Sequence, residues 1–277
     1  MFWTRLASGI VLAVLALITM GLGGIPLLAV LLLISLVAYR ELSKALQIHT
    51  EQDNAGFNAL EIAGYFGIVC YYASVYFADT DTVKFMVMIC GVMAILCVYV
   101  VTFPRFHAGQ VTAACFSLVY APVMLSFIYM TREYSNGDGG YMVWLILISS
   151  WGCDTCAYVV GKLIGKHKIF PKLSPKKSLE GCIGGVLGAA LIGGLYGYFF
   201  VEQVVLQQKV AGLIAFICAA GAVMSMVGDL AASAIKRNHN IKDYGKIIPG
   251  HGGVMDRFDS MIVTAPMIYL LTFVLIK

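Results

Sequence analysis

Long apolar runs recur along this 277-residue chain, and they limit its possible folds more than any other feature. A transmembrane helix needs about 17–25 apolar residues, and the runs have roughly this length. They are continuously apolar rather than alternating, which argues against a β-barrel. The sequence therefore predicts an all-α, polytopic transmembrane bundle of about nine helices. The predicted spans are residues 6–22, 25–38, 63–78, 86–103, 111–130, 141–161, 182–201, 210–228 and 261–276.

Composition agrees with a membrane protein, because only 12% of the residues are charged, whereas a soluble domain usually has ~25%. The first two runs are separated only by residues 21–24, so a re-entrant pair is an alternative to two spans there. No small-residue cleavage site is obvious, which favours an uncleaved first helix over a signal peptide. We divide the chain into N-terminal membrane helices at 1–135 and C-terminal membrane helices at 136–277, which carry the site.

Basic residues are distributed unevenly between the predicted loops. With nine spans and a cytoplasmic N-terminus, all but four of the 19 Lys and Arg residues fall on the cytoplasmic side, as the positive-inside rule expects. The four on the far side are Lys84, Arg132, Lys209 and Lys277. This topology places the 162–180 loop and segment 233–259 together in the cytoplasm. Attraction to anionic lipid headgroups is a simpler explanation of the lysines, but it does not explain the acidic residues among them.

Residues 233–259 read SAIKRNHNIKDYGKIIPGHGGVMDRFD and concentrate charge between two apolar runs. Charges at a membrane boundary are costly unless they are paired or functional. Carboxylates bind hard divalent cations, Lys and Arg bind phosphate oxygens, and glycines let the backbone approach a ligand closely. The residue types of this segment therefore predict a metal–phosphate site.

This segment resembles, position by position, the signature of the phosphatidate cytidylyltransferase (CDP-diacylglycerol synthase) family. The matching positions are Ser233, Lys236, Arg237, Lys242, Asp243, Gly245, Pro249, His251, Gly252, Gly253, Asp256, Arg257 and Asp259. The resemblance implies an enzyme that transfers a cytidylyl group from CTP to phosphatidate, giving CDP-diacylglycerol and pyrophosphate. It also implies Mg²⁺, a second cation near it, and a homodimer. The expected partners are CTP, phosphatidate and the lipid bilayer, without nucleic acid, at the inner (cell) membrane of a bacterium with the site facing the cytoplasm.

A second stretch matches the same family earlier in the chain. Its residues 174–181 resemble the motif S-P-K-K-[ST]-x-E-G, with Ser178 in the hydroxyl position. Six lysines between 162 and 177 suit a triphosphate that later leaves as pyrophosphate, because ammonium groups are mobile point charges. A Walker A loop is excluded, because GKLIGK at 161–166 is not followed by Ser or Thr.

Asp229 directly follows the eighth predicted span, and on a continuous helix it shares a face with Ser225 and Ser233. Its setting predicts a cation ligand, and the alternative is a simple ion pair with a basic residue such as Lys236. Asp256 begins the last predicted helix, where an acidic residue can also act only as a helix cap. The resemblance assigns both Asp229 and Asp256 to the catalytic metal.

We accordingly predict two sets of site residues. The catalytic set is Asp229, Asp256, Lys236, Arg237 and His251, with Asp229 and Asp256 as the metal ligands. The substrate-binding set is Ser174, Lys176, Lys177, Ser178, Glu180, Ser233, Lys242, Gly252, Gly253, Arg257, Asp259 and Asp154. Asp154 is included because an acid inside a predicted span is a functional candidate. Gly252 and Gly253 are expected to form a tight turn with N–H groups facing phosphate oxygens.

Several other residues are interpreted as packing, loop or span-edge residues rather than as parts of a site. Cys153 and Cys156 have redox or metal spacing, but no second pair supports such a site. Glycines at 184–194 indicate close helix packing rather than a nucleotide loop. His49 and Glu61 are interpreted as ordinary residues of a loop or span edge.

Two other functions are open at this stage. A CTP-dependent polyprenol or lipid kinase would transfer a γ-phosphoryl group to a hydroxyl and would need no lipid phosphate site. The full match over 233–259 argues against it. A transporter would use Asp154 and Asp229 as cation or proton sites, but the sequence shows no internal repeat. Pyrophosphate release from CTP supplied with phosphatidate separates the three functions.

Overall fold

Eight helices of the computed structural model are long and apolar enough to cross a membrane, which confirms the predicted polytopic helical fold. The structure describes residues 2–49, 56–134, 138–171, 173–206, 209–248, 250 and 252–276. The eight spans are Gly24–Ala45, Ala59–Phe77, Asp81–Val101, Ala108–Arg132, Gly139–Ile164, Leu179–Gln203, Ala211–Asn238 and Met255–Leu275. The first predicted span corresponds to a shorter apolar helix, Ser8–Leu22. Within the described ranges there is no strand, only two isolated β-bridges.

The chain divides into two compact units, each assembled from segments that are far apart in the sequence. Unit 1 comprises Met1–Ser126 and His239–Arg257, and unit 2 comprises Phe127–Asn238 and Phe258–Lys277. The signature segment 233–259 therefore contributes residues to both units. Each part of it is described below within its own unit.

Unit 1 holds the N-terminal helices. These are α1 (Phe2–Leu22), α2 (Gly24–Ala45), α3 (Ala59–Phe77), α4 (Asp81–Val101), α5 (Ala108–Leu118) and a π-helical turn, η1 (Val119–Val123). Unit 2 holds α7 (Gly139–Met142), α8 (Trp144–Leu147), the π-helical turn η2 (Ile148–Gly152), α9 (Cys153–Ile164), α10 (Leu179–Tyr196), the π-helical segment η3 (Gly197–Leu206) and α11 (Ala211–Asn238). Two helices, α6 (Met124–Arg132) and α12 (Met255–Leu275), begin in unit 1 and continue in unit 2.

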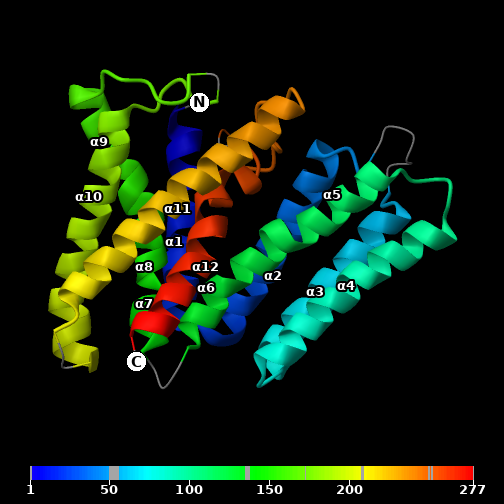
Figure 1. Ribbon diagram of the computed structural model, residues 1–277, viewed down its shortest axis with the longest axis horizontal. Coiled ribbons are helices and arrows are strands. Elements are labelled where there is room, and N and C mark those ends of the chain that lie inside the picture. The colour runs from blue at the N-terminus through cyan, green and yellow to red at the C-terminus, as the bar shows by residue number, and fades with distance from the viewer. Residues whose placement is uncertain are drawn as a thin grey trace. The chain divides into compact units, whose positions relative to one another are not determined.

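Glycines set the helix breaks and contacts of unit 1. Gly23 and Gly24 have φ values of 67° and 53°, a left-handed conformation that glycine adopts at little cost, and they separate α1 from α2. This break confirms the boundary predicted at 21–24. In Figure 1, α3 and α4 lie side by side, and they approach closely where a Cβ on Gly67 would lie 3.4 Å from the Gly91 Cα atom.

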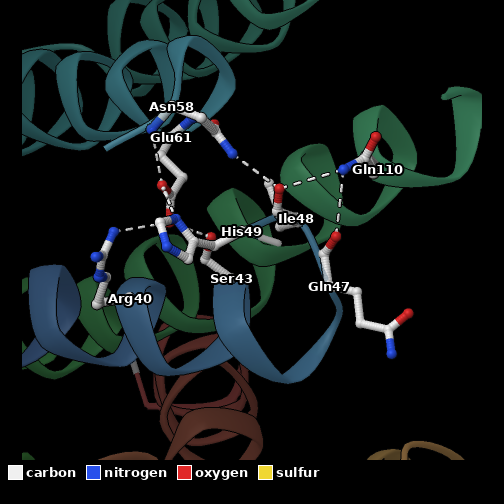
Figure 2. Close-up of polar contacts among 8 residues, drawn as sticks. All are labelled: Arg40, Ser43, Gln47, Ile48, His49, Asn58, Glu61 and Gln110. Carbon is white, nitrogen blue, oxygen red and sulfur yellow. Dashed lines mark hydrogen bonds and ion pairs between the residues drawn. The ribbon is translucent and has the colours of Figure 1, made fainter. Parts of the chain in front are cut away.

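A fully buried carboxylate, that of Glu61, ties α2 to the start of α3 (Figure 2). Its Oε1 atom accepts hydrogen bonds from Arg40 Nη1 at 2.9 Å and from Ser43 Oγ at 2.6 Å. Its Oε2 atom lies 2.9 Å from His49 Nδ1 and accepts the Asn58 backbone N–H at 3.0 Å, as part of a capping box. The structure places His49 in the loop after α2 and Glu61 in the first turn of α3, as predicted, and adds that they form a buried polar network between the two helices.

Glycines also form the helix contacts of unit 2, where α10 lies beside α9 and beside α11 (Figure 1). A Cβ on Gly184 would lie 2.5 Å from a methyl carbon of Val160, and a Cβ on Gly188 would collide with Cys156. Small residues let helix backbones approach in this way within a membrane. The prediction that these glycines serve packing is confirmed.

The cysteines of α9 also serve packing. Cys153 is fully buried, and its Sγ atom donates to the Ala222 carbonyl oxygen at 3.8 Å. All eight cysteines of the chain are free. Across the described ranges, no group of three or more His, Cys, Asp or Glu residues could hold a metal ion. Cys153 packs in a buried cluster with Ala189 and Ala222, and Cys156 packs against Gly188, which supports the packing interpretation.

Candidate active site

Unit 2 contains a cavity of about 450 Å³ lined by α9, by the loop that follows it, and by α10, with Met226 of α11. Four lysines of the lining, at positions 162, 168, 176 and 177, give it a positive charge. Asp154 contributes a carboxylate, and Tyr158 contributes an aromatic surface. A cavity with several ammonium groups is suited to a polyanion such as a triphosphate. Four of the predicted substrate-binding residues, Asp154, Lys176, Lys177 and Ser178, line this one cavity.

The lysine loop is fixed by two side chains at the start of α10. Ser178 is the N-cap residue, and its Oγ atom accepts the Gly181 N–H at 3.2 Å. Glu180 accepts the backbone N–H groups of Lys166 at 3.1 Å and His167 at 3.2 Å. His167 Nδ1 also lies 2.6 Å from Glu180 Oε1. In this structure Ser178 and Glu180 therefore hold the loop in place around the cavity.

Lys177 connects this loop to Asp229 on α11. Its Nζ atom lies 2.5 Å from Asp229 Oδ2, with the two side chains 20% and 32% exposed. The contact is an ion pair without hydrogen-bond geometry, and no described residue offers Lys177 Nζ a hydrogen bond. Because α11 runs unbroken from Ala211 to Asn238, Asp229 shares a helix with Ser225 and Ser233, as expected. The second motif and Asp229 thus meet within unit 2.

Two more carboxylates of unit 2 are close enough to interact electrostatically with this pair. Asp154 on α9 interacts with Asp229 and Lys177, and Asp259 on α12 interacts with Asp229 and Lys236. The backbones of α11 and α12 are close at this level, because a Cβ on Gly228 would lie 2.6 Å from the Asp259 carbonyl oxygen. The site therefore combines carboxylates from three helices with lysines from the loop and from α11.

Asp229 fits the role of a Mg²⁺ ligand. Mg²⁺ keeps several waters and is usually bound through one or two carboxylates together with substrate phosphates. Asp229 is about one-third exposed, and its carboxylate faces the lysine that borders the cavity. Since no three acidic, His or Cys side chains of the described residues could enclose a metal, a cation at Asp229 would take its other ligands mostly from water and substrate.

In unit 1, the signature segment makes a tight turn before α12. Gly252 has a φ of 85°, and its carbonyl oxygen accepts the Ile248 N–H at 3.0 Å. Asp256 is 8% exposed, and its Oδ2 atom accepts the N–H groups of Tyr244 at 2.9 Å and Gly253 at 3.0 Å. The glycine turn is present as expected, but the Gly253 N–H is bonded to Asp256 rather than directed toward a ligand.

Glu41, near the end of α2, is a partner of this turn that our sequence analysis missed. Its Oε1 atom accepts the Val254 N–H at 3.0 Å, and its Oε2 atom accepts the Met255 N–H at 2.7 Å. The carboxylate is 3% exposed. The only signal in the sequence is an acidic residue at the end of an apolar run, because 213 residues separate Glu41 from Val254.

The remaining predicted site residues differ in exposure. Arg237, Lys242 and Arg257 are exposed, whereas Ser174, Ser233, Lys236 and Asp259 are half-buried. His251, predicted to be catalytic, lies outside the described residues. Asp256 belongs to unit 1 and Asp229 to unit 2. Each therefore stays a predicted metal ligand, and its contacts are described only within its own unit.

Comparison with known proteins gives a family and several bacterial relatives. Residues 3–275 match the model of the Cytidylyltransferase family. A phosphatidate cytidylyltransferase of Rickettsia bellii is 36% identical over 157 residues, which are 56% of this chain and 66% of the relative. A phosphatidate cytidylyltransferase of Staphylococcus haemolyticus is 30% identical over 171 residues, which are 60% of this chain and 61% of the relative. The chain thus spans less than two thirds of the length of these relatives.

The family match extends from the first helix to the last and includes both motifs that build the site. It also agrees with a helical membrane protein, since eight helices within the matched range can span a bilayer. From these findings together, this chain belongs to the Cytidylyltransferase family.

Proposed function

We propose that this protein transfers a cytidylyl group from CTP to phosphatidate, giving CDP-diacylglycerol and pyrophosphate. The observation that carries the proposal is the lysine-lined cavity of unit 2, bordered by the Lys177–Asp229 ion pair, in a chain of the Cytidylyltransferase family. The bacterial relatives are named phosphatidate cytidylyltransferase, which supports the choice of substrates. A membrane location suits this reaction, because the acyl chains of substrate and product stay in the bilayer.

The proposed chemistry is an in-line displacement at the α-phosphorus of CTP. A phosphate oxygen of phosphatidate forms the new P–O bond while the bond to the oxygen that bridges the α- and β-phosphates breaks, and pyrophosphate leaves with that oxygen. The lipid supplies the nucleophile, so the protein needs none. Its task is to position two anions and to offset their repulsion. The cavity lysines are suited to this task, because they can hold the triphosphate and then release pyrophosphate.

Asp229 is the residue we propose to hold Mg²⁺, and Asp256 is proposed as a further ligand from its place in the signature. The ion, when bound, supplies charge neutralisation at the reacting phosphates. Lys177 is paired with Asp229 in the structure, so substrate binding requires it to exchange this carboxylate for a phosphate oxygen. Glu180 and Ser178 keep the loop in place during that exchange.

We further propose that the lysine loop faces the cytoplasm, where CTP is available. The uneven distribution of Lys and Arg supports this orientation. In a variant whose eight native cysteines are replaced by serine, a single cysteine introduced at the exposed position Lys166 is expected to react with a membrane-impermeant reagent only in inside-out vesicles. Reaction only in right-side-out vesicles would reverse the proposed orientation.

Purified protein supplied with CTP and phosphatidate is expected to release pyrophosphate and form CDP-diacylglycerol. A lipid kinase would instead release CDP in the presence of a lipid alcohol, and a transporter would do neither. Pyrophosphate release that requires both CTP and phosphatidate would support the proposal. Activity with a lipid alcohol but not with phosphatidate would reject it.

Lys177→Ala is expected to raise the KM for CTP about ten- to hundredfold with a smaller change in kcat. The reason is the loss of one charge-assisted contact made in the ground state, which costs ~1.5–3 kcal/mol. Steady-state kinetics with saturating phosphatidate measure the effect. Lys84→Ala is the matched control, because Lys84 pairs with Asp81 in unit 1 and should leave the KM unchanged. Wild-type kinetics for Lys177→Ala and for Lys176→Ala/Lys177→Ala would show that the loop lysines do not bind CTP and serve only to orient the chain in the membrane.

A further inference from the structure

We infer that Glu41 is a positioning residue: its carboxylate holds the turn at residues 252–256 of the signature segment, called the signature turn, in the one geometry that the proposed transfer reaction uses. The kinetic part of this inference rests on the proposed function, whereas the structural part does not. All the contacts that carry it lie within unit 1.

Glu41 accepts hydrogen bonds from backbone N–H groups at the start of α12. A helix leaves its first N–H groups without an intrahelical partner, and a side chain near the N-cap usually accepts them. Here the N-cap position is Val254, whose side chain has no acceptor. Glu41 on α2 supplies the acceptors instead: one carboxylate oxygen accepts the Val254 N–H, and the other accepts the Met255 N–H. Its negative charge also favours the positive end of the helix dipole.

Two glycines of the signature segment leave the space that the Glu41 carboxylate occupies. A Cβ on Gly253 would lie 2.5 Å from both oxygens of Glu41, and a Cβ on Gly245 would collide with Oε1. Any larger residue at either position would displace the carboxylate. Both glycines belong to the signature segment. Because they have no side chain, the Glu41 carboxylate fits next to them.

Glu41 and Asp256 bind the same turn. The Gly253 N–H donates to Asp256, and the next two N–H groups along the chain donate to Glu41. Two buried carboxylates from different helices therefore bind consecutive N–H groups of one turn, and this leaves the turn little freedom. Because the Asp256 carboxylate accepts the Gly253 N–H, its position depends on the same turn. This matters for the reaction, since Asp256 is predicted to bind metal.

The neighbouring position on α2 provides a natural comparison. Arg40 pairs with Glu61, which is buried like Glu41, but the hydrogen-bond partners of Glu61 lie on α2, in the loop after it and at the start of α3 (Figure 2). Loss of the Glu61 carboxylate should therefore weaken the fold of unit 1 without changing the turn. Loss of the Glu41 carboxylate should change the turn itself.

The test uses full-length protein in lipid nanodiscs with the variants Glu41→Gln, Glu41→Asp and Glu61→Gln. Gln keeps the volume of Glu41 but replaces one acceptor with an NH₂ group, so kcat should fall about tenfold or more while the KM for CTP stays within about threefold. Amide hydrogen exchange in the peptide covering 252–258 should become about tenfold faster. Asp keeps both oxygens on a shorter side chain and should lie between Gln and the wild type. Glu61→Gln should lower the melting temperature but leave kcat per folded enzyme and this exchange rate unchanged.

Several outcomes decide the inference. Wild-type kcat or wild-type exchange in Glu41→Gln would overturn it, and so would a loss of kcat in Glu61→Gln as large as that in Glu41→Gln. If Glu41→Gln does not fold, Glu41→Asp carries the test, and wild-type exchange and kcat in that variant would overturn the inference. If the wild type does not transfer cytidylyl groups, the proposed function fails, and the exchange rates alone decide whether Glu41 holds the turn.

Discussion

Asp229→Asn is expected to reduce cytidylyl transfer about a thousandfold, with the loss in kcat. Asn keeps the volume of the side chain but removes the charge that a hard cation requires. A metal ligand of this kind supports several kcal/mol of transition-state stabilisation, and roughly 4 kcal/mol corresponds to a factor of about a thousand. Rates at saturating CTP and phosphatidate, measured across a Mg²⁺ titration, test the expectation. The amount of folded protein should change little, because Asp229 is about one-third exposed.

Lys177 provides the control for this experiment. Asp229→Asn breaks the 2.5 Å ion pair with Lys177, and Lys177→Ala breaks the same pair from the other side. If the pair served only stability, both variants would show similar and small kinetic losses. A metal-binding Asp229 predicts a large loss in kcat for Asp229→Asn and a change mainly in KM for Lys177→Ala. Equal losses in the two variants would contradict the metal assignment at Asp229.

Asp256→Asn is the second substitution with a large expected effect, and it should abolish turnover while expression and membrane insertion stay intact. Asp256 accepts N–H groups from Tyr244 and Gly253 through one oxygen, Oδ2. The amide oxygen of Asn can accept the same two hydrogen bonds, and Asn caps helices about as well as Asp. The substitution therefore preserves the turn and removes the charge. Pyrophosphate release at saturating Mg²⁺ measures the result.

Asp259→Asn is the internal control for Asp256. In the structure the Oδ1 atom of Asp259 accepts the Ser260 backbone N–H at 2.8 Å, a local contact that Asn can keep. We expect a smaller loss of turnover than at Asp256. Near-normal turnover of Asp256→Asn at saturating Mg²⁺ would show that Asp256 is only a structural cap.

The sequence was sufficient to predict the membrane helices, because each span is a local pattern of apolar residues. The predicted span at 210–228 illustrates the limit of this reasoning. It ends at the first charged residue, whereas α11 continues to Asn238 and brings Asp229 and Lys236 onto the same helix. Helix ends within polar sequence depend on tertiary contacts, which a hydropathy pattern does not contain.

The cavity residues of unit 2 could be predicted because they also belong to a local sequence pattern. Lys176, Lys177 and Ser178 are adjacent in sequence, and the loop they belong to is closed by Glu180 of the same motif. The Lys177–Asp229 pair joins this motif to an acidic residue that was identified separately from its position next to the eighth predicted span.

Contacts between distant helices were beyond the reach of sequence patterns. Glu41 binds N–H groups more than two hundred residues away, and nothing near it in the sequence indicates this role. The partners of Glu61 could not be predicted for the same reason, since Arg40 and His49 come from the preceding helix and the loop after it (Figure 2). A buried carboxylate inside an apolar helix does indicate that partners exist, because an unpaired one would be costly. It does not indicate which residues they are.

The fate of labelled CTP is the most direct test of the proposed reaction. Full-length protein in lipid vesicles that contain phosphatidate is supplied with CTP labelled at either the α- or the γ-phosphate. Cytidylyl transfer predicts that the α-label enters the lipid fraction, that the γ-label appears in pyrophosphate, and that the two products form in equal amounts. Transfer of the γ-label to lipid with release of CDP, or no label in lipid under any of these conditions, would contradict it.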